Sequence, residues 1–230
     1  MANVVRILLL GKTGVGKSSF INYFLGKDVA AAGAGRPCTQ ELTKYVLNEW
    51  PDTSIELYDS KGLEVKDADN WTQQIIKELE EKSRLDFTER YHTIFYCISA
   101  QKKIESYEEK TLKELQKAAD QPIHVILTHC DNMADDKLEE RERCLKEKIS
   151  KTLCIYRITS IDKTKRGGTT IKKSGREEVV DGVFNLLWQD VISIMADKVA
   201  EDVVSQVEYA VCQIISVSYT HLRAHETDSY

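Results

Sequence analysis

The chain has 230 residues, of which 42% are hydrophobic and 30% charged, and its formal net charge is −5. The apolar content is sufficient for a core, so the composition excludes a wholly disordered chain. The counts of 11 glycines, 3 prolines and 6 cysteines exclude the collagen-like and disulfide-scaffold classes. The negative charge argues against a general nucleic-acid coat but leaves room for a local basic patch.

Two features of the sequence predict a cytoplasmic location. No apolar run reaches the roughly 18 residues of a membrane helix, and the first apolar run is too short for a secretory signal. The six cysteines are scattered and form no C-x-x-C pair, which is typical of a reduced cytosol.

The predicted elements alternate along the chain between apolar runs typical of strands and segments with helical spacing. In order, they are a strand at 4–10, a helix at 18–25, strands at 42–50 and 54–58, a helix at 71–83, a strand at 93–98, a helix at 107–119, a strand at 123–127, a helix at 138–149 and a strand at 154–158. Such alternation predicts an α/β fold with a mostly parallel six-stranded sheet. From Glu177 onward the pattern is wholly helical.

The C-terminal part of the chain divides into two stretches. Val199, Val203, Val207, Val211 and Ile214 keep one apolar face, so we interpret residues 191–216 as the start of a truncated helical region. A single long helix of the preceding domain is the alternative. Residues 217–227 resemble one reading frame of a translated sequencing adapter, so we treat 217–230 as a non-native tail and expect the natural protein to continue beyond Ser216. The alternative is a native polar tail.

Residues 11–18, GKTGVGKS, match the phosphate-loop pattern G-x-x-x-x-G-K-[ST] between a predicted strand and a predicted helix. In such a loop, backbone N–H groups at a helix N-terminus surround phosphate oxygens. Lys17 would supply charge to the β- and γ-phosphates, and the Ser18 hydroxyl would bind Mg²⁺. The predicted phosphate-binding residues are Gly11, Lys12, Thr13, Gly14, Val15, Gly16, Lys17, Ser18 and Ser19.

Two further segments are predicted to act on the metal and the γ-phosphate. Asp59 and Gly62 form a D-x-x-G motif at the end of a strand, where Asp59 can hold Mg²⁺ and the Gly62 N–H can reach a γ-phosphate. Thr39 lies in the loop between the phosphate loop and this motif, and its hydroxyl would reach Mg²⁺ when a γ-phosphate is present. Thr43 is the alternative to Thr39. We therefore predict Lys17, Thr39 and Gly62 as catalytic residues and Ser18, Thr39 and Asp59 as metal ligands.

Base recognition is predicted at Thr128, His129 and Asp131, directly after the strand at 123–127. A carboxylate at Asp131 can accept hydrogen bonds from the N1–H and N2–H₂ edge of guanine, which adenine lacks. Ser160 and Ile161 follow the next strand, where a backbone N–H can reach guanine O6.

Together these motifs resemble a G domain of the TRAFAC class of P-loop GTPases, over residues 1–190. The similarity is to Era-, septin- and "50S ribosome-binding GTPase"-type domains, in the form G-x-T-G-x-G-K-S-S-x-x-N at Gly11–Asn22 and in residues 37–40 and 58–64. It implies the three-layer α/β/α fold of P-loop NTPases, Mg²⁺-dependent binding of GTP and GDP, two switch loops and slow hydrolysis. Similar bacterial proteins carry a helical, often membrane-associated region after the G domain, so peripheral membrane association through the missing part is one expectation.

Three positions depart from the family pattern. His129 replaces the lysine of [NT]-K-x-D, so we expect weaker nucleotide binding. Leu63 follows D-x-x-G where small signalling GTPases place a water-orienting glutamine. Hydrolysis should therefore be slow until a partner protein, a homodimer or another residue completes the site. Gly14 stands where potassium-activated relatives carry asparagine, so we expect no potassium activation by that route.

Three charged or reactive features receive a plain structural interpretation. The basic stretch is Lys163, Lys165, Arg166, Lys172, Lys173 and Arg176, which we expect to be a solvated loop; contact with RNA, the ribosome or anionic lipid is the alternative. Cys130 is expected to be a packing thiol. The glutamates at 78, 80, 81, 105, 108 and 109 are expected to face solvent.

Three functions follow from these residues. The first is a GTP-hydrolysing switch, in which GTP orders Thr39 and Gly62 and hydrolysis releases them. The second is a nucleotide-binding module with little or no turnover, which Leu63 and His129 favour. The third is an ATP-using P-loop enzyme, against which Asp131 argues.

Overall fold

The computed structural model describes residues 3–30, 42–50, 53–60, 62–86, 89–119, 123–150, 153–164, 168, 170–185, 196 and 199–209. The chain divides into two compact units, Met1–Asp181 and Gly182–Tyr230. The predicted domain boundary at residue 190 and the tail at 217–230 lie outside the described residues and stay predictions. Among the described residues, no helix is both long and apolar enough to span a membrane.

The first unit is built on a six-stranded sheet in the order β2-β3-β1-β4-β5-β6. Its strands are β1 (Asn3–Gly11), β2 (Thr43–Trp50), β3 (Thr53–Asp59), β4 (Thr93–Ser99), β5 (Ile123–Thr128) and β6 (Cys154–Arg157). All neighbouring strands are parallel except β2 and β3, which are consecutive and form an antiparallel pair. This arrangement confirms the predicted mostly parallel sheet of six strands.

Helices α1 (Lys17–Leu25), α2 (Ala68–Ser83), α3 (Ser106–Ala118) and α4 (Asp135–Lys148) connect the strands. Single 3₁₀ turns lie at Val65–Asp67 and Cys130–Asn132. Residues 176–185 and 199–209 are also helical. The four helices predicted before residue 150 are present. Their first residues differ from the prediction by one to three positions and their last residues by at most one, as is usual for helix boundaries.

One face of the sheet is covered by α2, α3 and α4. Leu8 and Leu10 of β1 point into a core that contains Trp71, Leu112 and Leu145 from these three helices. Strands β4 and β5 are buried along their whole length, as expected for central parallel strands with helices on both faces.

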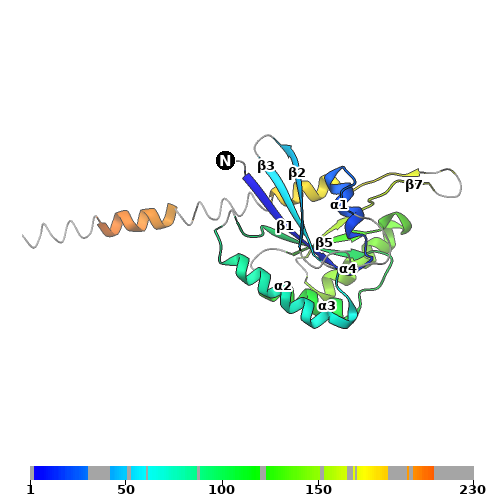
Figure 1. Ribbon diagram of the computed structural model, residues 1–230, viewed down its shortest axis with the longest axis horizontal. Coiled ribbons are helices and arrows are strands. Elements are labelled where there is room, and N and C mark those ends of the chain that lie inside the picture. The colour runs from blue at the N-terminus through cyan, green and yellow to red at the C-terminus, as the bar shows by residue number, and fades with distance from the viewer. Residues whose placement is uncertain are drawn as a thin grey trace, which may run out of the picture. The chain divides into compact units, whose positions relative to one another are not determined.

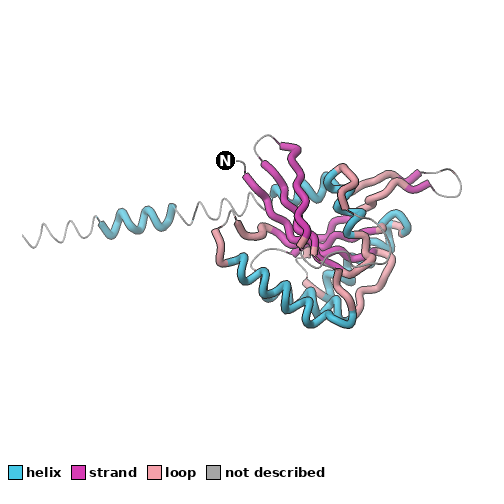
Figure 2. The backbone as a smooth tube through the Cα atoms, in the orientation of Figure 1, coloured by secondary structure: helices cyan, strands magenta, loops and turns pink. Residues whose placement is uncertain are grey.

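Helix α1 lies on the opposite face of the sheet (Figures 1 and 2). The side chains between α1 and the sheet form an aromatic layer. Phe20 of α1 packs edge-on against Phe95, whose ring contacts His124, and His124 in turn stacks on Tyr156. Arg176, at the start of the helix over 176–185, donates a 2.7 Å hydrogen bond to the carbonyl of Phe24. Helices therefore cover both faces, which confirms the three-layer α/β/α fold.

The basic stretch is not a plain loop. Residues Lys163–Thr164 and Thr170–Ile171 form the antiparallel hairpin β7–β8. Its base is closed by a bridge between Thr159 and Ser174 and by the Lys173 N–H, which donates to Asp162. The loop interpretation is wrong in this respect, because two strands of two residues each, with Ile171 as their one apolar residue, show no apolar periodicity.

One predicted solvent-facing glutamate is buried. Glu108 is 4% exposed, and its carboxylate accepts a hydrogen bond from the Glu105 backbone N–H in a capping box at the start of α3. The solvent-facing interpretation is therefore wrong for Glu108, since a capping role turns this side chain back toward the helix terminus.

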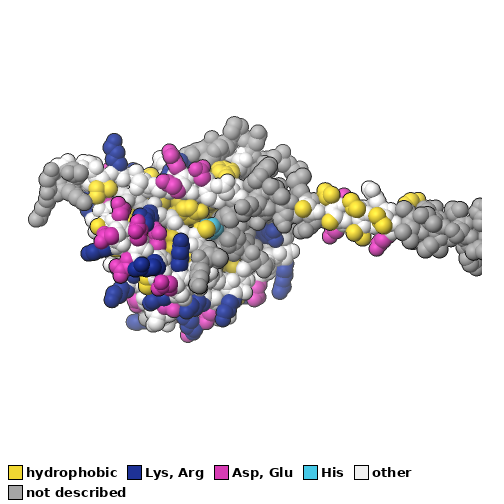
Figure 3. Space-filling model, turned by 180° about the vertical axis from the view of Figure 1, so that it is seen from behind, with side chains coloured by type: hydrophobic (Ala, Val, Ile, Leu, Met, Phe, Trp, Pro, Cys, Tyr) yellow, Lys and Arg dark blue, Asp and Glu magenta, His cyan; other side chains and the backbone are white. Residues whose placement is uncertain are grey.

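Within the described part of the second unit, residues 199–209 form a helix. Val199, Val203, Val204 and Val207 are each more than half exposed on it, and Figure 3 shows hydrophobic side chains along this helix. Val211 and Ile214 of the predicted apolar face lie outside the described residues.

Candidate functional site

The phosphate loop lies between β1 and α1, at the carboxyl end of a central strand. Gly14 and Gly16 adopt φ angles of 76° and 94°, which favour glycine, and Gly16 caps α1. These backbone angles let the loop turn its N–H groups inward before the helix begins. Val15 is buried, and Ser18 and Ser19 stand in the first turn of α1.

Lys17 is directed back across the loop. Its side chain is buried, and Nζ donates a 3.1 Å hydrogen bond to the carbonyl oxygen of Gly11. The positive charge is thus held beneath the phosphate loop, where a bound anion would balance it.

Asp59 ends β3 and lies beside Lys17. It is 8% exposed, and Oδ1 is buried without a hydrogen-bond partner in the described part of the chain. Burial raises the pKa of the Asp59 carboxyl to about 6, and the nearby charge of Lys17 opposes this rise. The neighbouring Ser60 hydroxyl is also buried and unpaired there. Such an orphaned carboxylate fits a divalent cation that prefers oxygen ligands.

Mg²⁺ typically takes one or two protein oxygens and completes its shell with phosphate oxygens and water. Asp59 and the Ser18 hydroxyl are the described residues that fit this role. The described residues contain no cluster of three or more His, Cys, Asp or Glu side chains that could hold a metal alone. The composition of the site therefore suits a cation that arrives with a nucleotide.

The D-x-x-G segment is joined directly to the phosphate loop. The Thr13 N–H donates to the Leu63 carbonyl at 3.2 Å, and the Leu63 N–H donates to the Gly11 carbonyl at 3.0 Å. Gly62 packs so closely that an added Cβ would lie 2.9 Å from the backbone nitrogen and Cα of Thr13. Only glycine fits here without displacing the loop. The Leu63 side chain is completely buried in the core beneath α2.

The predicted base motif is hydrogen-bonded to the same loop. Thr128 Oγ1 lies 2.5 Å from the Val15 carbonyl and 3.2 Å from the Ile98 carbonyl. His129 follows with a φ of 57°, the only positive φ of a non-glycine residue in the described part of the chain. Its ring lies against the phosphate loop, since a Cβ on Gly16 would be 2.9 Å from Cε1 of His129. Burial lowers the pKa of His129, and the charge of Asp131 opposes this effect.

Asp131 has a partner that sequence reasoning missed. Lys163 of β7 donates from Nζ to Asp131 Oδ2 at 3.1 Å and to Asn132 Oδ1 at 2.6 Å. The sequence identifies Lys163 as part of the basic stretch, but it does not predict the hairpin that brings Lys163 to Asp131. Cys130, between these groups, is buried, donates to the Leu127 carbonyl, and has a pKa raised to about 11 by burial.

The remaining predicted residues lie around this cluster or outside it. Ser160 and Ile161 follow β6 at the same sheet edge as Asp131, and the Ile161 side chain is 62% exposed. Thr39 lies outside the described residues. Its alternative, Thr43, begins β2 directly opposite Asp59 in the antiparallel pair.

Lys12 extends away from the loop toward α3. Its Nζ forms an ion pair with Glu105 and lies 5.3 Å above the centre of the Tyr107 ring. The hydrogen bond to Glu105 raises the pKa of Lys12. Lys12 therefore contributes its backbone to the loop, while its side chain fixes the loop to the N-terminus of α3.

The fold and the phosphate loop at the carboxyl end of its parallel strands define a P-loop GTPase G domain. The model of the family described as 50S ribosome-binding GTPase matches residues 6–129, which is more than half of the chain. The chain belongs to this family, and the resemblance stated from its motifs is confirmed.

Three similar proteins illustrate the relationship. GTPase Der of Persephonella marina (strain DSM 14350 / EX-H1) is 24% identical over 190 residues, which are 83% of this chain and 41% of Der. Era in complex with MgGDPNP and 16S ribosomal RNA nucleotides has a TM-score of 0.62 at 18% identity, covering 81% of this chain and 57% of Era. Toc33 from Arabidopsis thaliana with Mg²⁺ and GMPPNP has a TM-score of 0.61 at 14% identity, covering 80% and 85%. The chain thus spans less than two thirds of Der and of that Era chain.

Proposed function

We propose that this G domain binds GTP with Mg²⁺, hydrolyses it slowly to GDP and acts as a switch through the segments around Thr39 and Gly62. The observation that carries the proposal is the convergence of Lys17, the unpaired Asp59 carboxylate and Gly62 on one phosphate loop. Positive charge, a free carboxylate and inward backbone N–H groups are the three requirements for a nucleotide phosphate and its metal.

Each residue then has one role in this proposal. Loop N–H groups and Lys17 bind the β- and γ-phosphates, and Asp59 and Ser18 hold Mg²⁺, which neutralises charge that develops on the phosphates. Asp131 accepts from the guanine edge. Gly62 offers its N–H to the γ-phosphate. The next residue, Leu63, is hydrogen-bonded to Gly11 and Thr13, so these two bonds would respond to the presence of GTP.

Slow turnover is part of the proposal because of Leu63. A completely buried leucine offers no group to orient an attacking water. Completion of the site by a second copy of the chain or by an activating protein is the corresponding expectation.

A cytoplasmic location is also proposed, in keeping with the four described cysteines, all of which are free.

The second candidate function is a nucleotide-binding module with little or no turnover. It is favoured by the two hydrogen bonds that join Leu63 to Gly11 and Thr13, because they hold the D-x-x-G segment against the loop. Single-turnover hydrolysis of prebound GTP separates the two. Release of phosphate that is lost in Lys17→Ala supports the GTPase; GTP recovered intact supports the module.

Base selection is tested by displacement of a fluorescent GDP from the full chain with GTP, GDP and ATP. We expect strong preference for guanine nucleotides, shifted to xanthine nucleotides in Asp131→Asn, since the amide reverses one hydrogen bond. Equal displacement by ATP would contradict a guanine-specific site and would support the alternative of an ATP-using enzyme.

A further inference from the structure

A groove outside the nucleotide site lies between the turn after β4, residues 100–104, and α4. It encloses about 480 Å³, and its lining contains five Lys or Arg side chains and one acidic side chain, Glu140. The basic residues are Lys102, Lys103, Lys137, Arg141 and Lys148. We call this the α4 groove. It joins two segments that are more than thirty residues apart in sequence, so only the fold assembles it.

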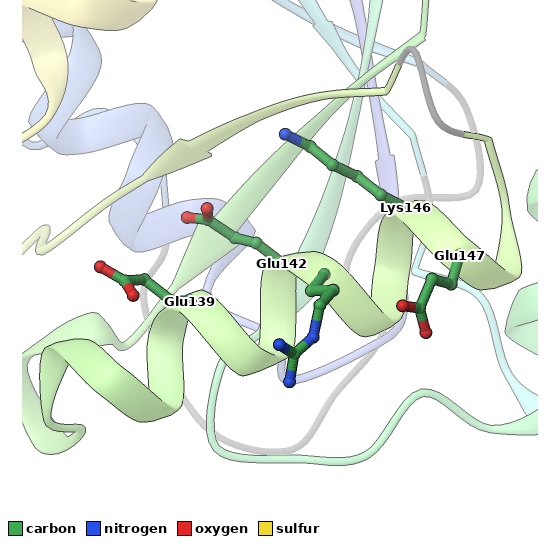
Figure 4. Close-up of a pocket in the computed structure, with 5 residues that line it drawn as sticks. Glu139, Glu142, Lys146 and Glu147 are labelled. Atoms are coloured by element: carbon green, nitrogen blue, oxygen red, sulfur yellow. The ribbon is translucent and has the colours of Figure 1, made fainter.

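Three cations of the groove share one side of α4. Lys137, Arg141 and Lys148 recur at spacings of four and seven residues, which places them on one side of a helix. The pocket on another side, of about 340 Å³, is lined by Glu139, Glu142, Arg143, Lys146 and Glu147. Figure 4 shows these acidic side chains projecting from that side of the helix. That pocket also contains Arg143 and Lys146, so both sides of α4 carry cations. Near the α4 groove, Glu140 in the lining and Glu108, whose charge acts on Arg141, offset part of the charge of the five cations.

The cations of the α4 groove are largely unpaired. Lys148 pairs with Glu109 at 3.6 Å, but within the described residues Lys102, Lys103, Lys137 and Arg141 have no ion pair. Nε and Nη2 of Arg141 are buried there without a hydrogen-bond partner. Burial lowers the pKa of this guanidinium, and the neighbouring Cys144 and the carboxylate of Glu108 oppose this effect. The four lysines are exposed, so solvent screens their mutual repulsion, whereas the two buried Arg141 nitrogens gain no such hydration. An anion in the groove would offset this cluster of positive charge in a chain of net charge −5.

The groove also has a size and a floor suited to a small molecule. Its volume falls in the range of about 300–1,000 Å³ typical of ligand pockets. Ala100 and Ile104 are buried in its wall, and Met133 adds an apolar surface. Guanidinium and ammonium groups around such a floor match the oxygens of phosphate groups.

We propose that the α4 groove is a second anion site, which binds a small molecule carrying two or more linked phosphate groups. Arg141 supplies the planar pair of donors, and Lys102, Lys103 and Lys137 approach from the rim. The site is separate from the phosphate loop, because none of its lining residues belongs to residues 11–18. It therefore stands whether or not the proposed hydrolysis of GTP holds.

The chain contains its own reporter and control for this site. Cys144 lines the α4 groove and is partly buried, whereas Cys154 is exposed in β6 and lies outside the lining. The experiment measures alkylation of both thiols in one sample of the full chain by mass spectrometry, with sodium tripolyphosphate as the probe. Saturating GDP without free Mg²⁺ keeps the phosphate loop filled. We expect the alkylation rate of Cys144 to fall at least fivefold while that of Cys154 is unchanged.

Matched variants locate the effect. In Lys102→Ala/Lys103→Ala and in Lys137→Ala, we expect the tripolyphosphate concentration for half protection to rise about tenfold. Lys146→Ala, which removes a lysine of the second pocket on α4, should leave it unchanged. Lys17→Ala should also leave it unchanged, which separates this site from the nucleotide site.

Other outcomes overturn the proposal. These are no protection of Cys144, equal protection of Cys154, or the same loss in Lys146→Ala as in the groove variants. Protection by a short RNA but not by tripolyphosphate would assign the groove to a nucleic-acid backbone instead. Comparison of tripolyphosphate with ATP then distinguishes an inorganic from an organic phosphate ligand.

Discussion

Thr128 Oγ1 donates a hydrogen bond of 2.5 Å to the carbonyl oxygen of Val15, 113 residues earlier in the chain. The bond joins the predicted base motif to the phosphate loop, and the same hydroxyl lies 3.1 Å from His129 Nδ1. A hydroxyl has one proton, so while Thr128 donates to a carbonyl it can accept a hydrogen bond from His129 in the tautomer that carries a proton on Nδ1. The two halves of the nucleotide site are therefore held in register without a ligand.

Thr128→Val tests this connection. The substitution keeps the shape but leaves the buried Val15 carbonyl without its donor, which costs about 1–3 kcal/mol. We expect a lower free energy of unfolding in urea and weaker binding of GDP. Thr128→Ser, which keeps the hydroxyl, should lose less on both measures; equal losses in the two variants would argue against the hydrogen bond.

His129→Lys should tighten nucleotide binding. A lysine can extend along the base and the phosphate loop, and a charge-assisted hydrogen bond adds on the order of 1–2 kcal/mol. Part of this gain is lost because lysine is less suited than histidine to the φ of 57° at this position. A fluorescent-GDP titration gives the result, and an unchanged dissociation constant would refute the role assigned to position 129.

Lys163→Met should alter base recognition rather than phosphate binding. Lys163 donates to Asp131 Oδ2, an acceptor that the guanine edge would need. Because this ion pair is partly exposed, its removal is worth only about 0.2–1 kcal/mol, so we expect a gain of up to about fivefold in GDP affinity. The matched control is Lys173→Met in the same hairpin. A similar gain there would show that the hairpin's total charge is responsible.

Gly62→Ala should weaken GTP more than GDP. An added Cβ would meet the Thr13 backbone at 2.9 Å, so the D-x-x-G segment must move away from the loop. Loss of one hydrogen bond to a charged γ-phosphate costs roughly 1.5–3 kcal/mol, or about tenfold or more in GTP affinity. Competition titrations with GTP and GDP measure the ratio. Equal weakening of both nucleotides would mean that Gly62 acts on the loop as a whole.

His124 should make the fold sensitive to mild acid. It is buried within the aromatic layer, neither ring nitrogen has a partner in the described structure, and burial lowers its pKa to about 4. Between pH 6.5 and 4 the unfolded chain binds a proton that the folded chain does not, so stability falls as the pH falls. The total is on the order of 3 kcal/mol.

The matched variant for this effect is His124→Phe, which keeps an aromatic ring between Phe95 and Tyr156. Its stability relative to the parent chain should rise as the pH is lowered from 6.5 to 4, measured by urea unfolding. Other titrating groups are shared by the two proteins and cancel in the difference. A difference that stays constant with pH would contradict a buried, neutral His124.

Local patterns were enough to predict most of the fold. The apolar runs predict all six strands of the main sheet, and GKTGVGKS predicts the turn from β1 into α1, because such features depend on residues close in sequence. The antiparallel β2–β3 pair also follows from the sequence, because only residues 51–53, Pro-Asp-Thr, separate the two predicted strands. The short hairpin β7–β8 was missed because two-residue strands carry too little pattern to separate from a loop.

The sequence by itself determined the chemistry of the phosphate loop and the succession of strands and helices along the chain, since backbone angles and apolar spacing are local properties. Tertiary structure alone decided which distant groups meet. It placed Lys163 on Asp131, the His129 ring on Gly16, and Lys102 and Lys103 opposite Arg141. Such contacts depend on how strands order themselves in a sheet and on which side of a helix faces a turn. A charged residue carries the same local signal whether the fold leaves it in solvent or brings it against a partner.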